Sequence, residues 1–529
     1  MKRSITVLVT ILFMLAVLPL RMYYLAVNPE SLPEISSSTQ KVLLSSLRGE
    51  IYDCNMKKLV NRKSHNVIIA RPEKKSAQIL EKYLEKSEYQ RLVSCIEESS
   101  PFICRTETEN DNFLSASVFE RYGDDGFCCH VLGYVNESDN TGVIGIEKGF
   151  DSYLKEDARK LFYTYNTTAE NKMLSGGKNE IISQNYNSQK GIVLTIDYDI
   201  QRIAENAMWL YGIEKGAVVV LDSSNGEIRA MASLPKFNQN NIAVSLNDKS
   251  SPFLNRALCA YSVGSVFKLV VAAAAVKEGK EDFTTFCSGS LDISEKTFAC
   301  SGFYSHGEVD VKKAMAHSCN TYFIRLALEI GKEKIIRTAQ NMGFSKAFEL
   351  AEGVYASGGA LPDTEEITSD GVLANLAFGQ GGLLATPLQI AGAYACVANG
   401  GRFIQPILVK AVTDSDGVKT QMNSGRYKYR AFLSAEAEKL KDILENNFNE
   451  GTCVSSKPEN CISGGKTSTA QTGWIDEKGD EIFHSWFAGF AEKNGKNYTI
   501  VVFKENGESG GADCGPVFKE IAQRIANNH

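Results

Sequence analysis

The sequence predicts an α+β protein in which an antiparallel sheet is covered by helices on both faces. Two hairpin patterns carry this prediction. Residues 217–221 are an apolar run that a turn joins to a second strand pattern over 227–233, and residues 485–490 and 498–503 flank an Asn-Gly turn. Helical patterns lie between and after these hairpins, so strands from both ends of the segment are expected to form one sheet packed between helices.

The elements around these hairpins follow from the same patterns. Residues 192–196 read as a strand, and Asp197 is placed to cap an amphipathic helix over 200–210. A last helix is expected from Pro516, with apolar residues on one stripe. The apolar run after Lys268 continues to Val276 without a polar face, so this helix is expected to be buried.

A chain of 529 residues is too long for one ordinary core. We expect a cytoplasmic tip and transmembrane anchor over 1–28, an extended pedestal module over 29–190, and a catalytic domain over 191–529. The 76–96 stretch of the pedestal is expected to form a surface helix or a helical pair. The net charge of −6 and the absence of a basic tract argue against a nucleic-acid partner.

The N-terminus predicts a membrane protein. Lys2 and Arg3 precede a long apolar stretch in which Arg21 is the one charged residue. The positive-inside tendency keeps the N-terminus cytoplasmic and places the rest of the chain outside the plasma membrane. A cleaved signal peptide is the alternative, but no small-x-small cleavage site stands out, which favours a retained anchor.

Ser265 and Lys268 form a candidate nucleophile and base. They lie three residues apart at the start of the buried helix, so their side chains share one face. A lysine in an apolar helix must be neutralised, paired or used, and burial favours its neutral, proton-accepting form. Ser-x-x-Lys alone proves little, because it recurs elsewhere in this chain and a helix cap with a solvated lysine would explain it.

Two further stretches make the pattern specific. Ser318-Cys-Asn320 follows the nucleophile, and Lys466-Thr467-Ser468 lies in an extended, small-residue segment before the terminal hairpin. In this order, the three motifs resemble those of penicillin-recognising serine acyltransferases. The chain is most similar to class B, monofunctional penicillin-binding proteins, the peptidoglycan D,D-transpeptidases. Further matching segments begin at the following residues: Arg48, Gly142, Thr195, Asn255, Phe378, Thr386 and Trp486.

The resemblance implies a role for each motif residue. Ser265 would be acylated, with Lys268 as general base, and Ser318 would carry a proton towards the leaving amine while Lys466 supplies positive charge. The implied substrate-binding group is the following: Asn320, Thr467, Ser468 and Thr469. The backbone N–H groups of Ser265 and Thr469 would form the oxyanion hole.

Two departures from the family pattern stand near these motifs. Ser468 replaces the usual glycine, from which we expect altered substrate fit, and Val263 replaces a frequent proline. Cys319 would place a thiol sensitive to oxidation beside the site. The chain has thirteen cysteines, and Cys287 with Cys300, or Cys453 with Cys461, could bridge. No cysteine spacing indicates a zinc site, so no metal or other cofactor is expected.

The resemblance implies cross-linking of peptidoglycan stem peptides, with β-lactams as covalent inhibitors. It also implies a membrane glycan polymerase as partner, because class B proteins lack a polymerising domain. Two alternatives remain open: a hydrolase with the same site, either a D,D-carboxypeptidase or a β-lactamase, and a non-catalytic β-lactam sensor or scaffold.

Overall fold

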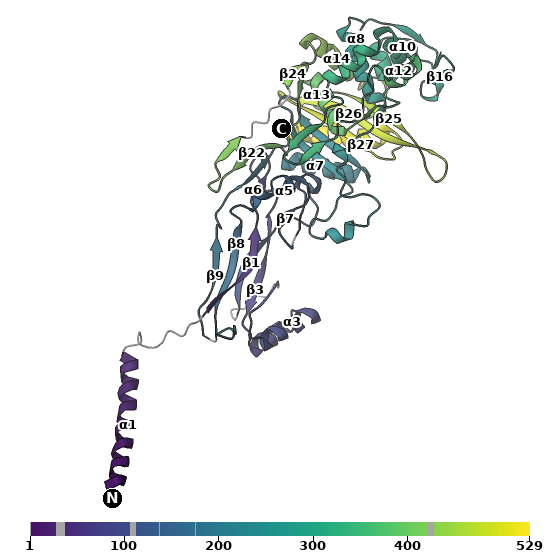
Figure 1. Cartoon of the computed structure of the whole chain (residues 1–529). Helices are drawn as coiled ribbons and strands as arrows, with labels where there is room; N and C mark the ends of the chain where they lie inside the picture. Colours follow the sequence, from purple (N-terminus) through teal and green to yellow (C-terminus); the bar gives the residue numbers. More distant parts are fainter. Residues whose placement is uncertain are drawn as a thin grey trace. The chain divides into compact units, whose positions relative to one another are not determined.

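The computed structural model describes residues 2–27, 38–105, 113–136, 138–174, 176–421 and 428–528. The chain divides into two compact units (Figure 1). The first contains 1–47, 64–119 and 159–186, and the second contains 48–63, 120–158 and 187–529. Each unit is considered by itself below.

The N-terminal helix α1, Lys2–Val27, contains a window long and apolar enough to cross a membrane. This window is Val7–Tyr24, with a mean hydropathy of 2.0 and none of its residues buried. Its length and composition agree with the predicted anchor. The predicted boundary between residues 28 and 29 lies outside the described residues.

Two three-stranded sheets form the rest of the first unit. One has the order β1 (Ser38–Leu47), β8 (Arg159–Thr167), β9 (Asn179–Gln184), and is antiparallel. The other has the order β4 (Phe102–Arg105), β3 (Lys63–Ala70), β5 (Leu114–Glu120). Helices α2 (Lys74–Leu80) and α3 (Lys86–Glu97) confirm the predicted helical pair. Leu80 and Leu92 of these helices pack with Phe102 of β4 in a small core.

The second unit takes more of the N-terminal sequence than the 29–190 boundary expects. Strand β2 (Glu50–Tyr52) pairs in parallel with β10 (Gly191–Leu194), so residues 48–63 belong to the second unit. The sheet continues through β22 (Val409–Thr413) and β23 (Lys419–Gln421). Short elements of 120–158 join this unit, as follows: α4 (Cys129–Leu132), β6 (Val135–Asn136), β7 (Thr141–Gly142), α5 (Gly145–Gly149) and α6 (Asp151–Lys155).

A buried ionic cluster holds these early residues in place. Glu147 is fully buried and pairs with Arg48 at 2.9 Å and with Arg121 at 2.7 Å. The hydroxyl of Tyr122 donates to the same carboxylate at 3.0 Å. A buried carboxylate needs such partners because desolvation of an isolated charge costs several kcal/mol.

The predicted antiparallel sheet is present with five strands. Its order is β12 (Glu227–Leu234), β11 (Gly216–Asp222), β27 (Lys496–Lys504), β26 (Glu481–Lys493), β25 (Ile462–Ile475). All four pairings are antiparallel, and β11 lies beside β27, so both ends of the segment close the sheet as predicted.

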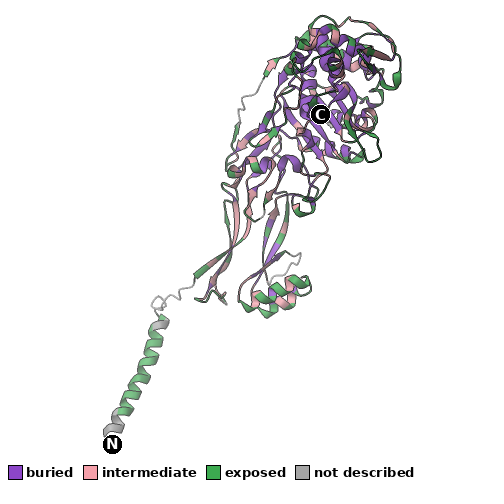
Figure 2. Cartoon of the chain, turned by 45° about the vertical axis from the view of Figure 1, so that its right-hand side comes forward, coloured by how far each residue is buried: buried purple, intermediate pink, exposed green. Residues whose placement is uncertain are grey.

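Helices cover both faces of this sheet, as the fold class predicts. The side chains of Val219 and Leu221 enter one core with α8 (Lys268–Lys277) and α13 (Pro387–Ala398), whereas Val218 and Val220 enter another with α7 (Tyr198–Leu210) and α15 (Gly515–Asn528). The alternation of side chains along a strand causes this division. Buried residues accordingly concentrate in this sheet and its helices (Figure 2).

The remaining helices of the unit are the following: α9 (Val311–Ala316), α10 (Asn320–Ile330), α11 (Lys332–Asn341), α12 (Asp370–Ala377) and α14 (Ser434–Asn446). Short strands complete it, as follows: β13 (Tyr261–Ser262), β14 (Thr285–Cys287), β15 (Ser290–Ile293), β16 (Lys296–Ala299), β17 (Gly307–Val309), β18 (Phe348–Ala351), β19 (Val354–Ala356), β20 (Leu384–Ala385), β21 (Arg402–Ile404) and β24 (Lys428–Arg430). Asp197 caps α7 as predicted, accepting from the backbone N–H groups of Asp199 and Ile200.

Candidate active site

A tight turn delivers Ser265 to the start of α8. Ser265 lies in a 3₁₀ turn, Gly264–Phe267, which leads directly into that helix. Gly264 has φ +62°, and a Cβ there would lie 2.4 Å from the hydroxyl oxygen of Ser468. Glycine is therefore required both by the backbone conformation and by the close approach of strand β25.

The ammonium group of Lys268 is buried against the second motif. Its Nζ lies 2.7 Å from the carbonyl oxygen of Ser318, 3.1 Å from the Ser318 hydroxyl and 2.7 Å from Oδ1 of Asn320. Burial lowers the pKa of Lys268 well below its usual value, and the nearby charge of Lys466 lowers it further. Both causes favour the neutral amine, the form that can accept a proton.

Ser318 connects Lys268 to Ser265 through hydrogen bonds. Its hydroxyl donates to the Ser265 hydroxyl at 3.0 Å while it accepts from Lys268. Ser318 has φ +55°, a left-handed conformation uncommon for a non-glycine residue and frequent at functional sites. The spacing of Ser265 and Lys268 predicts that their side chains lie on one face of the helix. The hydrogen bonds of the described residues join them through Ser318.

Asn320 is fixed at both ends of its amide. Its Oδ1 accepts from Lys268, and its Nδ2 donates to the carbonyl oxygen of Ala299 at 2.8 Å. Ala299 ends strand β16, so the short strands between α8 and α9 hold this side chain in orientation. Asn320 is the first residue of α10, and the two contacts fix the orientation of its side chain next to Lys268.

Strand β25 supplies the third motif. Lys466 is fully buried, and burial lowers its pKa to about 8 even though the neighbouring Cys453 thiol opposes the shift. Thr467 donates its hydroxyl to that of Thr452 at 2.8 Å. Thr469 is exposed, and its hydroxyl accepts from the backbone N–H of Gly510 at 3.2 Å. This edge strand therefore offers a buried cation and an exposed hydroxyl beside the other two motifs.

The Ser468 side chain does not lie with the substrate-binding group to which the family resemblance assigns it. Its side chain is buried, and its hydroxyl donates to the carbonyl oxygen of Val263 at 3.0 Å, behind the nucleophile turn. Neighbouring residues of a strand point to opposite faces, so Ser468 lies on the face opposite to Thr467 and Thr469. Its side chain thus supports the turn that carries Ser265 instead of lining a substrate site.

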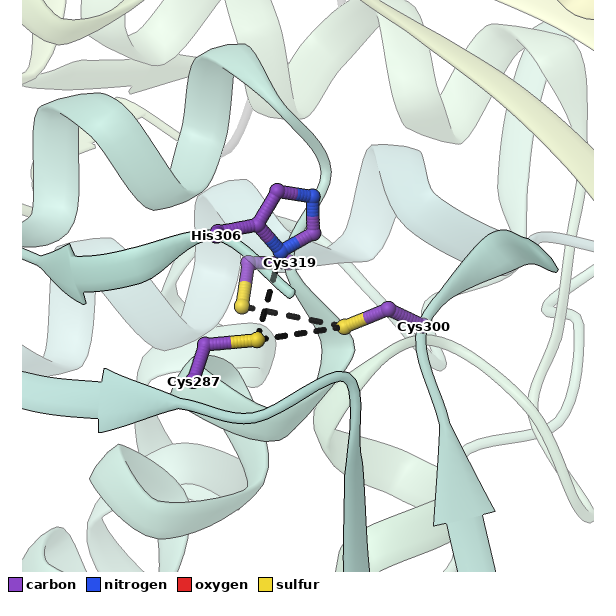
Figure 3. A group of neighbouring side chains, drawn as sticks. All are labelled: Cys287, Cys300, His306 and Cys319. Atoms are coloured by element: carbon purple, nitrogen blue, oxygen red, sulfur yellow. Dashed lines mark hydrogen bonds between the residues drawn. The ribbon is translucent and has the colours of Figure 1, made fainter. Parts of the chain in front are cut away.

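The cysteines form no disulfide among the residues that the structure describes. All thirteen lie in the described ranges and are free thiols, including both pairs that could have bridged. Figure 3 shows the thiols of Cys287, Cys300 and Cys319 gathered with the imidazole of His306. The spacing argument against a metal site missed this group, because strand pairing β14–β17 and the hairpin β15–β16 bring together residues distant in sequence.

One protein-family model covers the segment that carries these motifs. The penicillin-binding protein transpeptidase domain matches residues 216–523. The chain belongs to this family. The three motifs of this penicillin-binding protein all lie within the matched segment.

Curated relatives are similar over most of the chain. Stage V sporulation protein D of Bacillus subtilis is 27% identical over 514 residues, covering 90% of this chain and 77% of the relative. The peptidoglycan D,D-transpeptidase PbpA of Mycolicibacterium smegmatis is 28% identical over 358 residues, covering 61% of this chain and 70% of the relative.

Solved structures share the fold. The D,D-transpeptidase domain of a peptidoglycan glycosyltransferase from Eggerthella lenta gives a TM-score of 0.66 at 23% identity, covering 91% of this chain and 99% of that one. Penicillin-binding protein 3 of Mycobacterium tuberculosis in complex with aztreonam gives 0.66 at 22% identity, covering 93% and 97%.

The position of the Ser468 side chain can be tested by Ser468→Gly, which restores the usual family residue. Loss of one buried hydrogen bond is expected to destabilise the protein by about 1 kcal/mol. The rate of reaction with a fluorescent penicillin should change by only a few fold, because the hydroxyl faces the turn. Thermal unfolding and stopped-flow fluorescence measure the two effects. A tenfold faster reaction would show instead that the Ser468 side chain obstructs the substrate site.

Proposed function

We propose that this penicillin-binding protein is a peptidoglycan D,D-transpeptidase that acts through an acyl-enzyme on Ser265. The observation that carries the proposal is the continuous hydrogen-bonded path from Lys268 Nζ through Ser318 Oγ to Ser265 Oγ. A serine with a neutral base connected to its hydroxyl has the arrangement of an activated nucleophile. Relatives named peptidoglycan D,D-transpeptidase support the substrate class.

The first half-reaction transfers the donor stem peptide to the enzyme. Ser265 Oγ attacks the carbonyl carbon of the terminal D,D-peptide bond, and its proton passes through Ser318 to Lys268. The backbone N–H groups of Ser265 and Thr469 stabilise the developing oxyanion. The C–N bond then breaks, and Ser318 returns a proton to the leaving amine. Lys466 supplies positive charge to this network.

The second half-reaction forms the cross-link. The amino group of an acceptor stem peptide attacks the acyl carbon, and a new C–N bond forms. The ester bond between this carbon and Ser265 Oγ then breaks, and Ser265 Oγ, the leaving group, recovers a proton from the attacking amine through the same path. If water attacks instead, the product is a shortened stem peptide, which is carboxypeptidase chemistry. The acyl-enzyme thus divides one difficult exchange into two easier ones.

Three side chains hold the donor peptide. Asn320 is oriented by Lys268 and Ala299, so its amide is available in one fixed direction towards the peptide. The hydroxyl groups of Thr467 and Thr469 lie on one face of β25 and bind the terminal carboxylate. Lys466 has no carboxylate partner among its described contacts. Its positive charge attracts the terminal carboxylate of the donor peptide.

The N-terminal region anchors the enzyme beside its partners. Helix α1 crosses the plasma membrane once, with Lys2 and Arg3 on the cytoplasmic side and the catalytic unit outside. The first compact unit serves as the pedestal, and a membrane glycan polymerase supplies the strands to be cross-linked. Similar solved structures include one described as coordinating polymerisation and cross-linking in a peptidoglycan synthase complex.

The experiment that tests this function is the intact mass of the full-length protein in detergent after reaction with a penicillin. Wild type should gain one drug mass and keep it for hours, and Ser265→Ala should gain none. Ser301→Ala, a change at an exposed serine outside the motifs, is the matched control and should react like wild type. Rapid release of hydrolysed drug would indicate a β-lactamase, and an unmodified wild type would indicate a non-catalytic scaffold.

The acylation rate should also depend on pH through Lys466. Its pKa of about 8 means that the positive charge is present below that pH and is lost above it. If this charge attracts the drug carboxylate, the second-order rate constant falls as pH rises through about 8. Stopped-flow acylation between pH 6 and 10 measures the profile, at constant ionic strength. A rate constant that stays level or rises across this interval would contradict the assigned role of Lys466.

A further inference from the structure

Three thiols and one imidazole converge beside the second motif. The sulfur of Cys300 lies 3.8 Å from that of Cys287 and 3.8 Å from that of Cys319. The sulfur of Cys287 lies 3.3 Å from Nδ1 of His306. All four ligand atoms lie within 4.8 Å of one another, and Figure 3 shows them directed at a common centre.

Three of these separations, 3.8, 3.8 and 3.3 Å, are close to those between the ligands of a tetrahedral metal ion. With a Zn–S distance of about 2.3 Å, tetrahedral geometry places two sulfur ligands about 3.8 Å apart. Zn–N bonds of about 2.0–2.1 Å place sulfur and nitrogen about 3.5 Å apart, close to the distance observed here. Three cysteines and one histidine are a common ligand set for structural zinc, and soft thiolate ligands select against magnesium and calcium.

The segment that carries three of these ligands has little other core. Between residues 285 and 309 most side chains are exposed or half-buried. Besides Cys287 and Cys300, its buried residues are Gly289, Phe298 and Val309. Such small segments are commonly held by a disulfide or a metal, because their apolar burial alone is insufficient. Since the thiols are free, a metal is the remaining cross-link of this kind.

The same segment makes the contact that orients Asn320. The Ala299 carbonyl accepts from Asn320, Ala299 precedes Cys300, and Cys319 lies between Ser318 and Asn320. A group that cross-links Cys300 and Cys319 therefore fixes the positions of both partners of this contact, Ala299 and Asn320. It also fixes the left-handed backbone of Ser318, whose hydroxyl contacts Ser265.

We propose that Cys287, Cys300, His306 and Cys319 bind one Zn²⁺, which fixes the second motif in its active conformation. The zinc is structural, because four protein ligands leave no open position for water or substrate. The four residues act as positioning residues. This second part of the proposal rests on the proposed function, whereas metal binding does not.

Metal analysis of the full-length protein, purified in detergent with a reductant, tests the site directly. Inductively coupled plasma mass spectrometry should find about one zinc per chain in wild type, as a single four-ligand site requires. Cys300→Ser should lose this zinc. Cys396→Ser is the matched control, because Cys396 is also a fully buried free thiol but lies in α13, and it should keep the zinc.

Cobalt substitution and chelation of wild type keep the test valid if Cys300→Ser fails to fold. Co²⁺ added to zinc-free wild type should give the visible and near-ultraviolet bands of thiolate-bound tetrahedral cobalt. Zinc-free wild type should react with a fluorescent penicillin about 10–100-fold more slowly, since small displacements of reacting groups cost this much. Zn²⁺ should restore the rate, and Mg²⁺ should not.

Three results would overturn the proposal. Wild type that neither carries zinc nor takes up Co²⁺ has no site. A mass two hydrogens lower, with Cys287 and Cys300 in one disulfide-linked peptide, shows that a disulfide takes its place. Zinc that is bound without any effect of its removal on acylation disproves the positioning role. Failure of the proposed function is separate: zinc would bind, but neither form of the protein would be acylated.

Discussion

The proposed active site depends on the hydrogen bonds that the Ser318 hydroxyl makes to Lys268 and Ser265. Lys268 begins a helix whose other buried residues are all apolar, so its amine has been removed from water. Burial favours the neutral amine. The polar groups of the second motif then provide the partners that a buried nitrogen requires. The positions of Ser265, Lys268 and Ser318 therefore depend on the same packing around α8.

Three neighbouring strands maintain this arrangement. Strand β25 packs against the nucleophile turn, where Gly264 leaves room for Ser468 and the Val263 carbonyl accepts its hydroxyl. The indole N–H of Trp486 on β26 donates to the carbonyl of Ser262 at 2.9 Å and fixes the same turn. Strand β16 ends at Ala299, whose carbonyl oxygen accepts from Asn320 and so holds this side chain. A small shift of any of these strands would change the distances between Ser265 and its neighbours.

Much of the fold could be predicted because its signals are local. The buried helix after Lys268, the hairpin at Asn494-Gly495 and the Asp197 cap each depend on a short stretch of sequence. The direction of Ser468 could not be predicted, because it depends on the register of β25 against the nucleophile turn. The cluster of Cys287, Cys300, His306 and Cys319 was missed for a related reason. Cys287 ends strand β14, Cys300 follows β16, His306 precedes β17 and Cys319 is the N-cap of α10. No short spacing in the sequence therefore indicates the cluster.

The most direct test of this account is a double-mutant cycle between Lys268 and Ser318. The second-order rate constant for acylation by a fluorescent penicillin is measured for wild type, Lys268→Ala, Ser318→Ala and the double variant, with thermal unfolding to confirm folding. If one proton path uses both groups, each single change should cost about 10²–10⁴-fold, and the double change little more than the worse single one. Single effects that multiply in the double variant would show that Lys268 and Ser318 act independently, and would contradict the account.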